Sequence, residues 1–251
     1  MKLIFFIIAL LMGLFSQQDE TNLEPENYPS KAELLGQIDP ASHPDFVQID
    51  PAISYFPEVY LRKQTYDAFL NMRETALKDG INLTIQSGTR SFYIQRYLWN
   101  QKFTGQRSTG MAYIDQSLSD SLKTAKVLEY SAMPGISRHH WGTDIDINSI
   151  KHAYFYSGEG KKVYDWLQEN ANKFGFYQVY IPFGEDRKTG FNHEEWHWTY
   201  KPESDKFTKA FRHVISYEDL IGFKGDEYAK SFQVIKDYVY GINPILLENT
   251  K

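Results

Sequence analysis

The sequence predicts an α+β fold. Segments with the 3.6-residue periodicity of helices stand among short runs that are β-branched or that alternate apolar with polar residues. No repeated strand–helix–strand rhythm runs through the chain, which argues against a parallel α/β sheet. The chain has 251 residues, of which 42% are hydrophobic and 16% aromatic, so one domain with a packed core is expected.

The N-terminal segment has the pattern of an export signal. A basic residue precedes an apolar run over 3–15, which is shorter than the roughly 20 residues of a membrane span. We expect a signal peptide over 1–16 and a polar linker over 17–33. Leu14 and Phe15 stand where a cleavage site has small residues, so a retained N-terminal anchor is the alternative.

The folded domain is expected to begin near Leu34. A helix is predicted over 61–78, and Gly80 is placed to end it. The face of this helix that follows the helical spacing consists of Tyr66, Phe69, Leu70, Arg73 and Leu77. A strand over 83–85 and a turn over 87–91 follow, with Ser91 as the predicted N-cap of a second helix.

The second half of the domain continues this mixture of helices and strands. A third helix is expected to end near Tyr130, before a loop that contains Pro134 and Gly135. Strands are predicted over 143–147 and 177–181, with a helix over 163–174 between them that ends at Gly175. We place the main domain at 34–201 and a helical C-terminal extension, without candidate site residues, at 202–251.

Charge and cysteine content exclude several classes of function. The formal net charge is -5 and no basic run is present, which argues against nucleic acid or anionic lipid as the main partner. The chain has no cysteine, so a thiol nucleophile, disulfides and a cysteine-ligated metal are excluded. Any metal must therefore be bound by histidines and carboxylates.

One cluster of metal-ligand residue types spans 137–146, Ser-Arg-His-His-Trp-Gly-Thr-Asp-Ile-Asp. His139 precedes Gly142, where the chain can turn sharply, and Asp146 lies on the strand that follows. The turn brings His139 back over Asp146, a pair of ligand types that zinc accepts. The alternative is a polar turn with solvated aspartates.

A second cluster spans 192–198, Asn-His-Glu-Glu-Trp-His-Trp. Glu194 stands three residues before His197 among bulky aromatic residues, and apolar surroundings suit a carboxylate to general-base chemistry. The same residues spell H-E-x-x-H, in which His193 and His197 would bind zinc from one helix. The glycines and aromatics around them do not favour a helix, so we expect a strand instead.

A third feature is Ser-Gly-Thr-Arg-Ser at 87–91, followed by Gln95 on the next helix. An arginine at the end of a strand can hold a carboxylate or polarise a carbonyl, although a solvated turn arginine is the ordinary alternative. Taken in order, the three segments resemble the VanY-type D-alanyl-D-alanine carboxypeptidases, which are zinc enzymes. That family has S-G-x-R-S, then S-x-H-x-x-G-x-A-x-D, then E-x-W-H.

The resemblance covers roughly 34–201 and implies a role for each matched residue. His139, Asp146 and His197 would be the zinc ligands, Glu194 the base that activates water, and Arg90 the group that polarises the scissile carbonyl. Ser137 and Gln95 would line the substrate cleft. The implied fold is a small antiparallel sheet that carries Zn2+ and is flanked by helices.

Three residues depart from the family pattern: Asp144 replaces a common alanine, Thr199 replaces a frequent arginine, and His140 adds an imidazole. We expect Asp144 to bring a second carboxylate near the metal. The predicted partner is a peptidoglycan stem peptide, cut by a monomer in the periplasm or cell envelope. The alternatives are an L,D-carboxypeptidase, a wall endopeptidase or a metal-bearing wall-binding module without activity.

Overall fold

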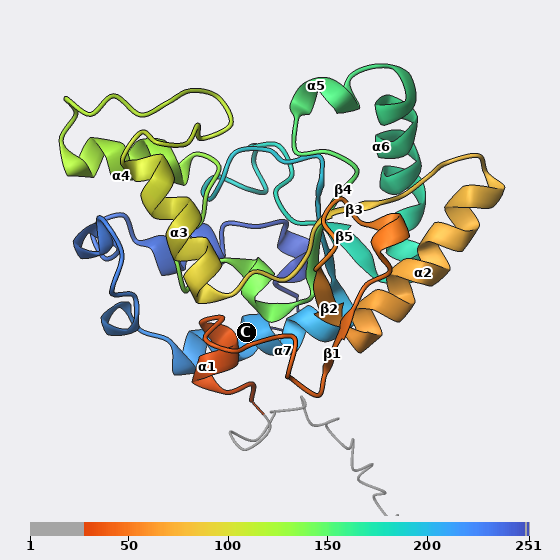
Figure 1. Ribbon diagram of the computed structural model, residues 1–251, viewed down its shortest axis with the longest axis horizontal. Helices are drawn as coiled ribbons and strands as arrows, with labels where there is room; N and C mark the ends of the chain where they lie inside the picture. The colour runs from red at the N-terminus through yellow and green to blue at the C-terminus, as the bar shows by residue number, and fades with distance from the viewer. Residues whose placement is uncertain (1–27, 249, 251) are drawn as a thin grey trace, which may run out of the picture.

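The computed structural model describes residues 28–248 and residue 250. The predicted α+β class is confirmed: a four-stranded antiparallel sheet stands between helices, and a two-stranded sheet lies next to it (Figure 1). The strands are β1 (Phe46–Gln48), β2 (Tyr60–Arg62), β3 (Ile85–Ser87), β4 (Asp144–Ile147), β5 (Phe176–Gln178) and β6 (His197–Tyr200). The α-helices are α1 (Lys31–Leu34), α2 (Lys63–Lys78), α3 (Phe92–Phe103), α4 (Asp120–Leu128), α5 (His152–Phe155), α6 (Gly158–Asn170) and α7 (Lys201–Val214).

The described fold begins slightly earlier than the sequence predicts. Ser30 caps α1 through a capping box with Glu33, and Leu34 is fully buried. The end of the predicted linker is therefore structured, because its Ser and Glu stand at the spacing that starts a helix. The predicted signal peptide lies outside the described residues. No helix in the described part of the chain is both long and apolar enough to cross a bilayer.

Helix α2 buries a different face from the predicted one. Its buried residues are Thr65, Phe69, Met72 and Ala76, whereas Leu70 and Leu77 are 38% and 45% exposed. The helix also starts at Lys63, because Leu61 belongs to β2. Residues such as Thr65 and Ala76 are buried where neighbouring elements pack closely against the helix. The position of these elements cannot be read from the apolar residues of the helix alone. The predicted end is confirmed, since the helix stops before Gly80 at φ +76°.

The other predicted elements are confirmed with small shifts of boundary. Ser91 caps α3 by accepting a hydrogen bond from the Ile94 N–H, as predicted. Strand β3 starts two residues later than expected, and β5 is shorter than the predicted 177–181. Helix α6 passes into a 3-10 turn, Ala171–Phe174, which ends at Gly175 with φ +82°.

The main sheet has the order β3-β4-β6-β5, and its two faces differ in chemistry. One face contributes Ile85, Ile145, Ile147, Phe176 and Trp198 to a core with α2 and α6. Because side chains alternate along a strand, the intervening residues of β4 and β6 point to the opposite face. That face carries Asp144, Asp146, His197 and Thr199.

The C-terminal segment is part of the fold and is only partly α-helical. Helix α7 is followed by short 3-10 helices and one π-helical turn, Ile235–Val239, rather than by the continuous helical extension that we expected. Phe207, Phe211 and Leu246 belong to the same core as Trp99 on α3 and Leu128 on α4. This core lies on the side of the sheet away from α2 and α6 (Figure 1).

Candidate metal centre

The register of the sheet brings two predicted ligands together. Asp146 on β4 stands directly opposite His197 on β6 and is also paired with Ser87 on β3. Side chains of directly opposite residues in an antiparallel pair lie on one face, with their Cβ atoms about 5 Å apart. Asp146 Oδ1 is accordingly 3.6 Å from His197 Nδ1.

A tight turn adds the third predicted ligand. His139 lies in a 3-10 helix, Arg138–Trp141, that ends at Gly142 in the left-handed conformation with φ +74°. A Cβ at Gly142 would stand 2.4 Å from the Phe46 ring, so only glycine fits this turn. The His139 Nδ1 donates to the Gly88 carbonyl at 2.8 Å, which leaves its Nε2 facing Asp146 Oδ1 at 3.4 Å.

The three residues fit a divalent metal ion. One ligand atom from each of His139, Asp146 and His197 lies within 4.8 Å of the others, and all three side chains are buried. His139 Nε2 and Asp146 Oδ1 are buried and have no hydrogen-bond partner among the residues that the structure describes. Buried polar atoms normally form hydrogen bonds. A nitrogen and an oxygen that face each other with free lone pairs and no such bond therefore indicate a site for a metal ion between them. Two imidazoles and one carboxylate are a donor set that suits zinc.

Protonation of these side chains agrees with metal binding. Burial, together with the nearby Arg90 charge, lowers the pKa of His139, which keeps its imidazole neutral as a metal ligand requires. Burial alone would raise the pKa of Asp146, but His139 and His197 hold it below its ordinary value. Burial would lower the pKa of His197, yet Asp144 and Glu194 raise it to about 9. A metal ion must therefore displace a proton from His197.

Glu194 lies beside the cluster and is held by its main chain. Its N–H donates to the Tyr180 carbonyl at 3.0 Å, and its own carbonyl accepts a bond from Gln178 Nε2 at 2.8 Å. Its Oε2 is 3.1 Å from His197 Nδ1. Burial raises the pKa of Glu194, although the bond to His197 opposes the shift. A raised pKa moves a carboxylate toward the range in which it exchanges protons near neutral pH.

Asp144 contacts His197 at Nε2, the ring nitrogen that does not face Asp146. Its Oδ2 accepts from His197 Nε2 at 2.9 Å and from Arg138 Nε at 2.8 Å, and its Oδ1 accepts from the Thr199 hydroxyl at 2.6 Å. The expected second carboxylate is thus present, but it binds the outer nitrogen of a ligand. The Arg138 charge and the bond to His197 lower the pKa of Asp144 against the effect of burial.

Two of the three departures from the family pattern, Asp144 and Thr199, form one structural unit. Asp144 is paired with Thr199 across the β4–β6 register, and the Arg138 guanidinium donates to both. Arg138 is 1% exposed and also donates to Thr208 at 3.2 Å. A buried arginine from the preceding 3-10 turn therefore lies beside Thr199 and pairs with the carboxylate of Asp144.

Arg90 and His140 are connected through the main chain. The Arg90 N–H donates to the His139 carbonyl at 3.1 Å, and the His140 Nδ1 donates to the Arg90 carbonyl at 2.7 Å. The His140 Nε2 accepts from the Gly135 N–H at 3.0 Å, so both ring nitrogens are used. Burial lowers the pKa of His140 to about 3, and the neutral ring joins two loops instead of binding metal.

Ser137 and Gln95, the two residues predicted to line the cleft, are both buried. Ser137 precedes the 3-10 turn that carries His139, and its carbonyl accepts from the His140 N–H at 3.0 Å. Gln95 Nε2 donates to the Ala132 carbonyl at 2.7 Å, whereas its Oε1 has no partner. Ser137 is thus two residues from the ligand His139, and Gln95 keeps an acceptor without a partner among the described residues.

The H-E-x-x-H alternative is wrong. Residues 193–196 are not helical, and His197 begins β6. His193 Nε2 is 3.2 Å from the Tyr164 hydroxyl and 3.1 Å from Gln178 Nε2, so it does not join the cluster. The predicted absence of a helix is confirmed, because the glycines and aromatics of this segment favour an extended chain.

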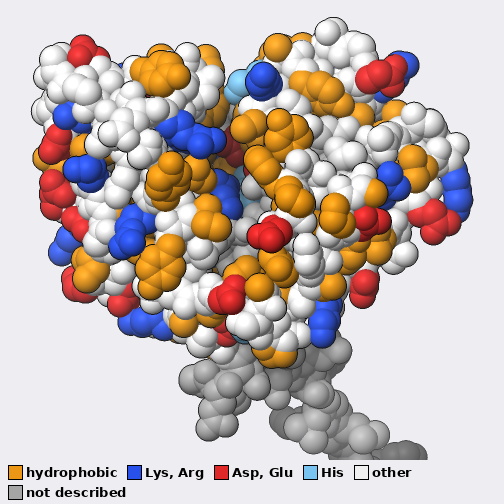
Figure 2. All heavy atoms as spheres, viewed as in Figure 1, with side chains coloured by type: hydrophobic (Ala, Val, Ile, Leu, Met, Phe, Trp, Pro, Cys, Tyr) orange, Lys and Arg blue, Asp and Glu red, His pale blue; other side chains and the backbone are white. Residues whose placement is uncertain are grey.

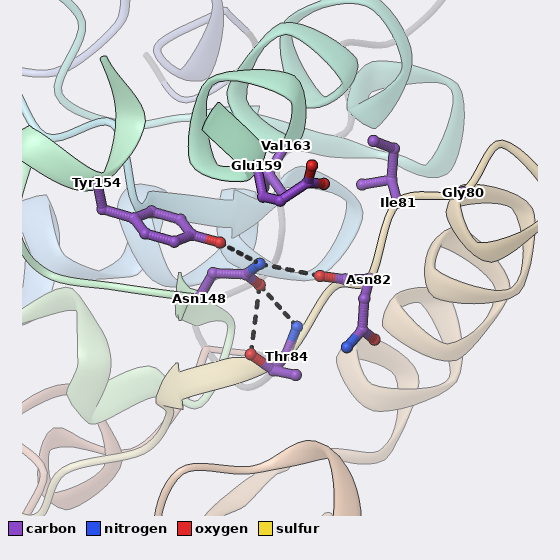
Figure 3. A pocket seen from close by; sticks show the side chains of 8 residues that line it. All are labelled: Gly80, Ile81, Asn82, Thr84, Asn148, Tyr154, Glu159 and Val163. Atoms are coloured by element: carbon purple, nitrogen blue, oxygen red, sulfur yellow. Dashed lines mark hydrogen bonds between the residues drawn. The ribbon is translucent and has the colours of Figure 1, made fainter. Parts of the chain in front are cut away.

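Two other regions with ligand or pocket character do not match this chemistry. Glu33, His43 and Asp45 lie close together, but Arg62 binds both carboxylates at 2.7 and 3.0 Å and takes the place of a cation. A pocket of about 330 Å³ lies between the 80–84 segment and α6 (Figure 3). Asn148, on its wall, uses its amide for bonds within the chain, including one from the Thr84 N–H at 2.7 Å.

Sequence reasoning missed one charged residue near the site. Lys102 lies on the last turn of α3, and the charges of Arg90 and Glu194 act on it. The only signal in the sequence is its position seven residues after Gln95, which places both residues on one face of the helix.

The antiparallel sheet, the buried His–Asp–His cluster and the adjoining carboxylate together define an α+β domain with a candidate metal centre. Residues 58–203, more than half of the chain, match the family model VanY, D-alanyl-D-alanine carboxypeptidase. The protein belongs to the VanY family, and the resemblance carried by its three motifs is confirmed.

The chain is also similar in sequence to individual bacterial carboxypeptidases. YodJ of Bacillus subtilis is 29% identical over 194 residues, which cover 72% of this chain and 62% of YodJ. A D-alanyl-D-alanine carboxypeptidase of Enterococcus faecalis is 30% identical over 148 residues, covering 59% of this chain and 50% of that protein. The matched part is thus between half and two thirds of the length of these relatives.

Solved structures share the fold. The LD-carboxypeptidase LdcB superposes with a TM-score of 0.51 at 24% identity, covering 86% of this chain and 81% of LdcB. A VanY mutant from a VanB-type resistance cassette, solved in complex with Zn(II), has a TM-score of 0.50 at 22% identity and covers 73% and 93%. The predicted small antiparallel sheet with flanking helices is therefore the fold of this family.

Proposed function

We propose that this protein is a zinc-dependent D-alanyl-D-alanine carboxypeptidase that removes the terminal D-alanine from peptidoglycan stem peptides. The observation that carries the proposal is the buried cluster of His139, Asp146 and His197, with two unpartnered ligand atoms, beside the carboxylate of Glu194. Family membership supports the reaction class. The VanY relative that was solved with Zn(II) supports the choice of metal.

His139, Asp146 and His197 would hold the ion through Nε2, a carboxylate oxygen and Nδ1. The His139 Nδ1 is bonded to the Gly88 carbonyl and the His197 Nε2 to Asp144. The His197 Nδ1 faces Asp146 and contacts Glu194 Oε2 at 3.1 Å, so an ion would take the place of the proton shared with Glu194. Three protein ligands leave a position open, which is typical of catalytic zinc sites. Zinc held there supplies Lewis-acid chemistry, which polarises a carbonyl group and makes water more acidic.

The remaining steps belong to side chains of the chain itself. Glu194 accepts a proton from the attacking water and passes it to the nitrogen of the departing D-alanine. Arg90, half-buried and close enough for Asp146 and Glu194 to act on its charge, donates hydrogen bonds to the scissile carbonyl oxygen as negative charge develops there. Gln95 and Ser137 line the cleft and orient the peptide. No covalent intermediate with the protein is required.

The substrate class follows from relatives and from the predicted location. VanYB, a fold neighbour with a TM-score of 0.50, was solved with D-Alanine-D-Alanine bound. We extend this ligand to the present site because the VanY family match includes all three ligands, Glu194 and Arg90. The export pattern of residues 1–16 supports the proposal that the reaction takes place in the periplasm or cell envelope, where such peptides occur.

The deciding experiment is mass spectrometry of synthetic tri-, tetra- and pentapeptide stems after incubation with the zinc-loaded protein, with and without a chelator. Loss of one D-alanine from the pentapeptide only, abolished by the chelator, is the expected result. Cleavage of the tetrapeptide would instead indicate an L,D-carboxypeptidase. Cleavage of cross-linked stems would indicate an endopeptidase.

Metal content tests the metal site, and cleavage separates an enzyme from a metal-bearing binding module. We expect about one zinc per chain in protein purified without chelator, since the site offers a single set of ligands. A protein that holds zinc and binds stems but cuts none of them would be the wall-binding module.

A further inference from the structure

A lysine shares one wall of the cleft with the proposed substrate residues. Lys102 follows Gln95 by seven residues on α3, so the two side chains project from the same face of the helix. Both reach the segment that follows α4. Gln95 Nε2 donates to the Ala132 carbonyl at 2.7 Å, and Lys102 Nζ donates to the Ser131 hydroxyl at 2.5 Å.

In the described part of the chain, the Lys102 ammonium has no anionic partner. Among residues 28–248 and 250, its hydrogen-bond partner is the neutral Ser131 hydroxyl, and no carboxylate forms a salt bridge with it. The positive charges of Arg90 and Arg107 act on Lys102, and only Glu194 opposes them. A partly buried ammonium with three donors is unfavourable without an acceptor of opposite charge. This wall of the cleft therefore favours an anion.

Two neighbouring atoms on the same wall are also unsatisfied. Gln95 Oε1 and Arg90 Nε are buried and have no hydrogen-bond partner in the described chain. The orientation of the Gln95 amide is fixed, because the Ala132 carbonyl can only accept. The wall thus offers an acceptor at Gln95, a donor at Arg90 and a cation at Lys102. These match the N–H, the carbonyl oxygen and the carboxylate at the end of a peptide.

We propose that Lys102, held in place by Ser131, binds the C-terminal carboxylate of the peptide substrate. The inference rests on the proposed function, which removes a single residue. Successive Cα atoms are ~3.8 Å apart, so the carboxylate of a single leaving residue lies close to the scissile carbonyl. Its cation must accordingly stand near Arg90, and Lys102 is near enough to be affected by that charge.

The surface of the molecule agrees with this placement. Figure 2 shows a hollow between the part that carries α3 and α4 and the part that carries α5 and α6, with Lys and Arg side chains along the α3 side. A peptide that lies in this hollow presents its charged end to that side. Lys102 would then make the enzyme selective for peptides with a free C-terminal carboxylate. A substrate whose carboxyl group is part of an amide bond has no negative charge there and would leave the Lys102 ammonium unpaired.

The test is equilibrium binding by calorimetry, with the zinc-loaded Glu194→Gln protein as background so that no cleavage occurs. The probes are D-Ala-D-Ala and its C-terminal amide. We expect the background protein to prefer the free acid by ~10–100-fold, the value of a charge-assisted hydrogen bond. Adding Lys102→Met should remove this preference, and adding Lys102→Arg should keep most of it.

The control is Lys78→Met, which removes an exposed lysine of α2 that pairs with Glu74. It should leave the preference unchanged. Equal binding of acid and amide by the background protein, binding of neither, or an unchanged preference after Lys102→Met would overturn the inference. The proposed function is judged separately: acid-selective binding without cleavage of any stem by the unmutated protein would refute the function and leave the role of Lys102 intact.

Discussion

At the scale of single residues, Glu194 is subject to two opposing influences. Burial favours its neutral form and raises its pKa, whereas the hydrogen bond to His197 favours the carboxylate. The result is a group that accepts a proton more readily than an exposed glutamate yet remains aimed at the cluster. Because its main chain is bonded to Tyr180 and Gln178, replacement of the side chain leaves its position intact.

We therefore expect Glu194→Gln to lower kcat by a factor on the order of 10²–10⁴, the usual loss when a general base is removed. Zinc content, measured by metal analysis, should stay at the wild-type level because Glu194 is not among the three ligands. Loss of zinc in parallel with activity would show that Glu194 is a ligand, and unchanged activity would remove it from the mechanism.

A second pair of residues tests which histidines bind the metal. His139 has a free Nε2 inside the cluster, whereas both nitrogens of His193 face other partners, with Tyr164 and Gln178 at Nε2 and Glu195 at Nδ1. His139→Ala should yield protein that is poor in zinc and inactive, while His193→Ala should still purify with zinc. The opposite pattern would contradict the ligand assignment and the roles inferred from the family.

Lys102 makes substrate binding dependent on pH. Burial and the charges of Arg90 and Arg107 lower the pKa of Lys102 to about 8, so its positive charge is complete below that pH and is lost above it. KM for a free-carboxylate stem should accordingly rise as pH increases beyond about 8, and a bound carboxylate should delay the rise. Lys102→Arg should abolish the rise, because a guanidinium stays protonated. An identical pH profile in the two proteins would argue against Lys102 as the carboxylate group.

Some residues of the candidate site could be predicted from the sequence and others could not, for a physical reason. The ligands and Glu194 belong to short segments in which a glycine or a strand fixes their direction, so the resemblance to the family motifs could be carried over onto them residue by residue. Lys102 and Ser131 come from separate segments, and only packing of α3 against the residues after α4 brings them together. The role of Asp144 also depended on which nitrogen of His197 it faces, which a sequence does not contain.

At the scale of elements, the antiparallel pairing of β4 and β6 organises two layers of the site. The pair Asp146–His197 supplies two ligands, and the pair Asp144–Thr199, two residues along, supplies their support on the same face. Arg138 links the second layer by donating to both of its members. The register of β4 and β6 thus positions both the two ligands, Asp146 and His197, and the carboxylate of Asp144 that orients His197.

This arrangement predicts different effects for two members of the second layer. Asp144→Asn removes the charge that holds the His197 Nε2 proton and should weaken zinc binding about 10–100-fold, as measured by competition with a chelator. Thr199→Val removes a hydrogen bond to the other carboxylate oxygen and should cost about 1–3 kcal/mol of stability with little change in zinc affinity. Equal effects of the two changes on zinc affinity would mean that Asp144 acts through stability alone.

Element boundaries were predictable where a local signal marks them. Ser91, Gly80 and Gly175 each ended or began a helix as expected, because capping and left-handed turns are local chemistry. The buried face of α2 was not predictable from its apolar stripe, since the helix packs against β1, β2 and the distant 3-10 turn Ala171–Phe174, whose positions a sequence does not show. Strands of three or four residues gave only approximate limits, because their extent depends on the partner strand.

At the scale of the whole molecule, the sheet separates two cores and the C-terminal segment encloses the one nearer the site. Trp99 on α3 donates its indole N–H to the Lys224 carbonyl at 2.7 Å, and its ring packs edge-on against Phe223 with centroids 6.1 Å apart. Further along, the Asn243 N–H donates to the Val179 carbonyl at 2.8 Å, just after β5. The segment after α7 thus connects α3 to the end of the sheet, although the sequence suggested a separable extension.

We therefore expect a chain that ends at Val214 to lose cooperative unfolding and zinc binding. The loss would remove buried residues that fill the core around α3, namely Ile215, Leu220, Phe223, Ala229, Val234, Val239, Ile242 and Leu246. Thermal unfolding checks this, with paired point changes as controls within the full chain. Phe223→Ala should cost about 3–5 kcal/mol as a large buried ring is removed, whereas Ile221→Ala, at a side chain 65% exposed, should change stability by no more than about 0.5 kcal/mol. A shortened chain that still unfolds cooperatively and binds zinc would show instead that residues 34–201 form an independent domain, as their motifs alone suggested.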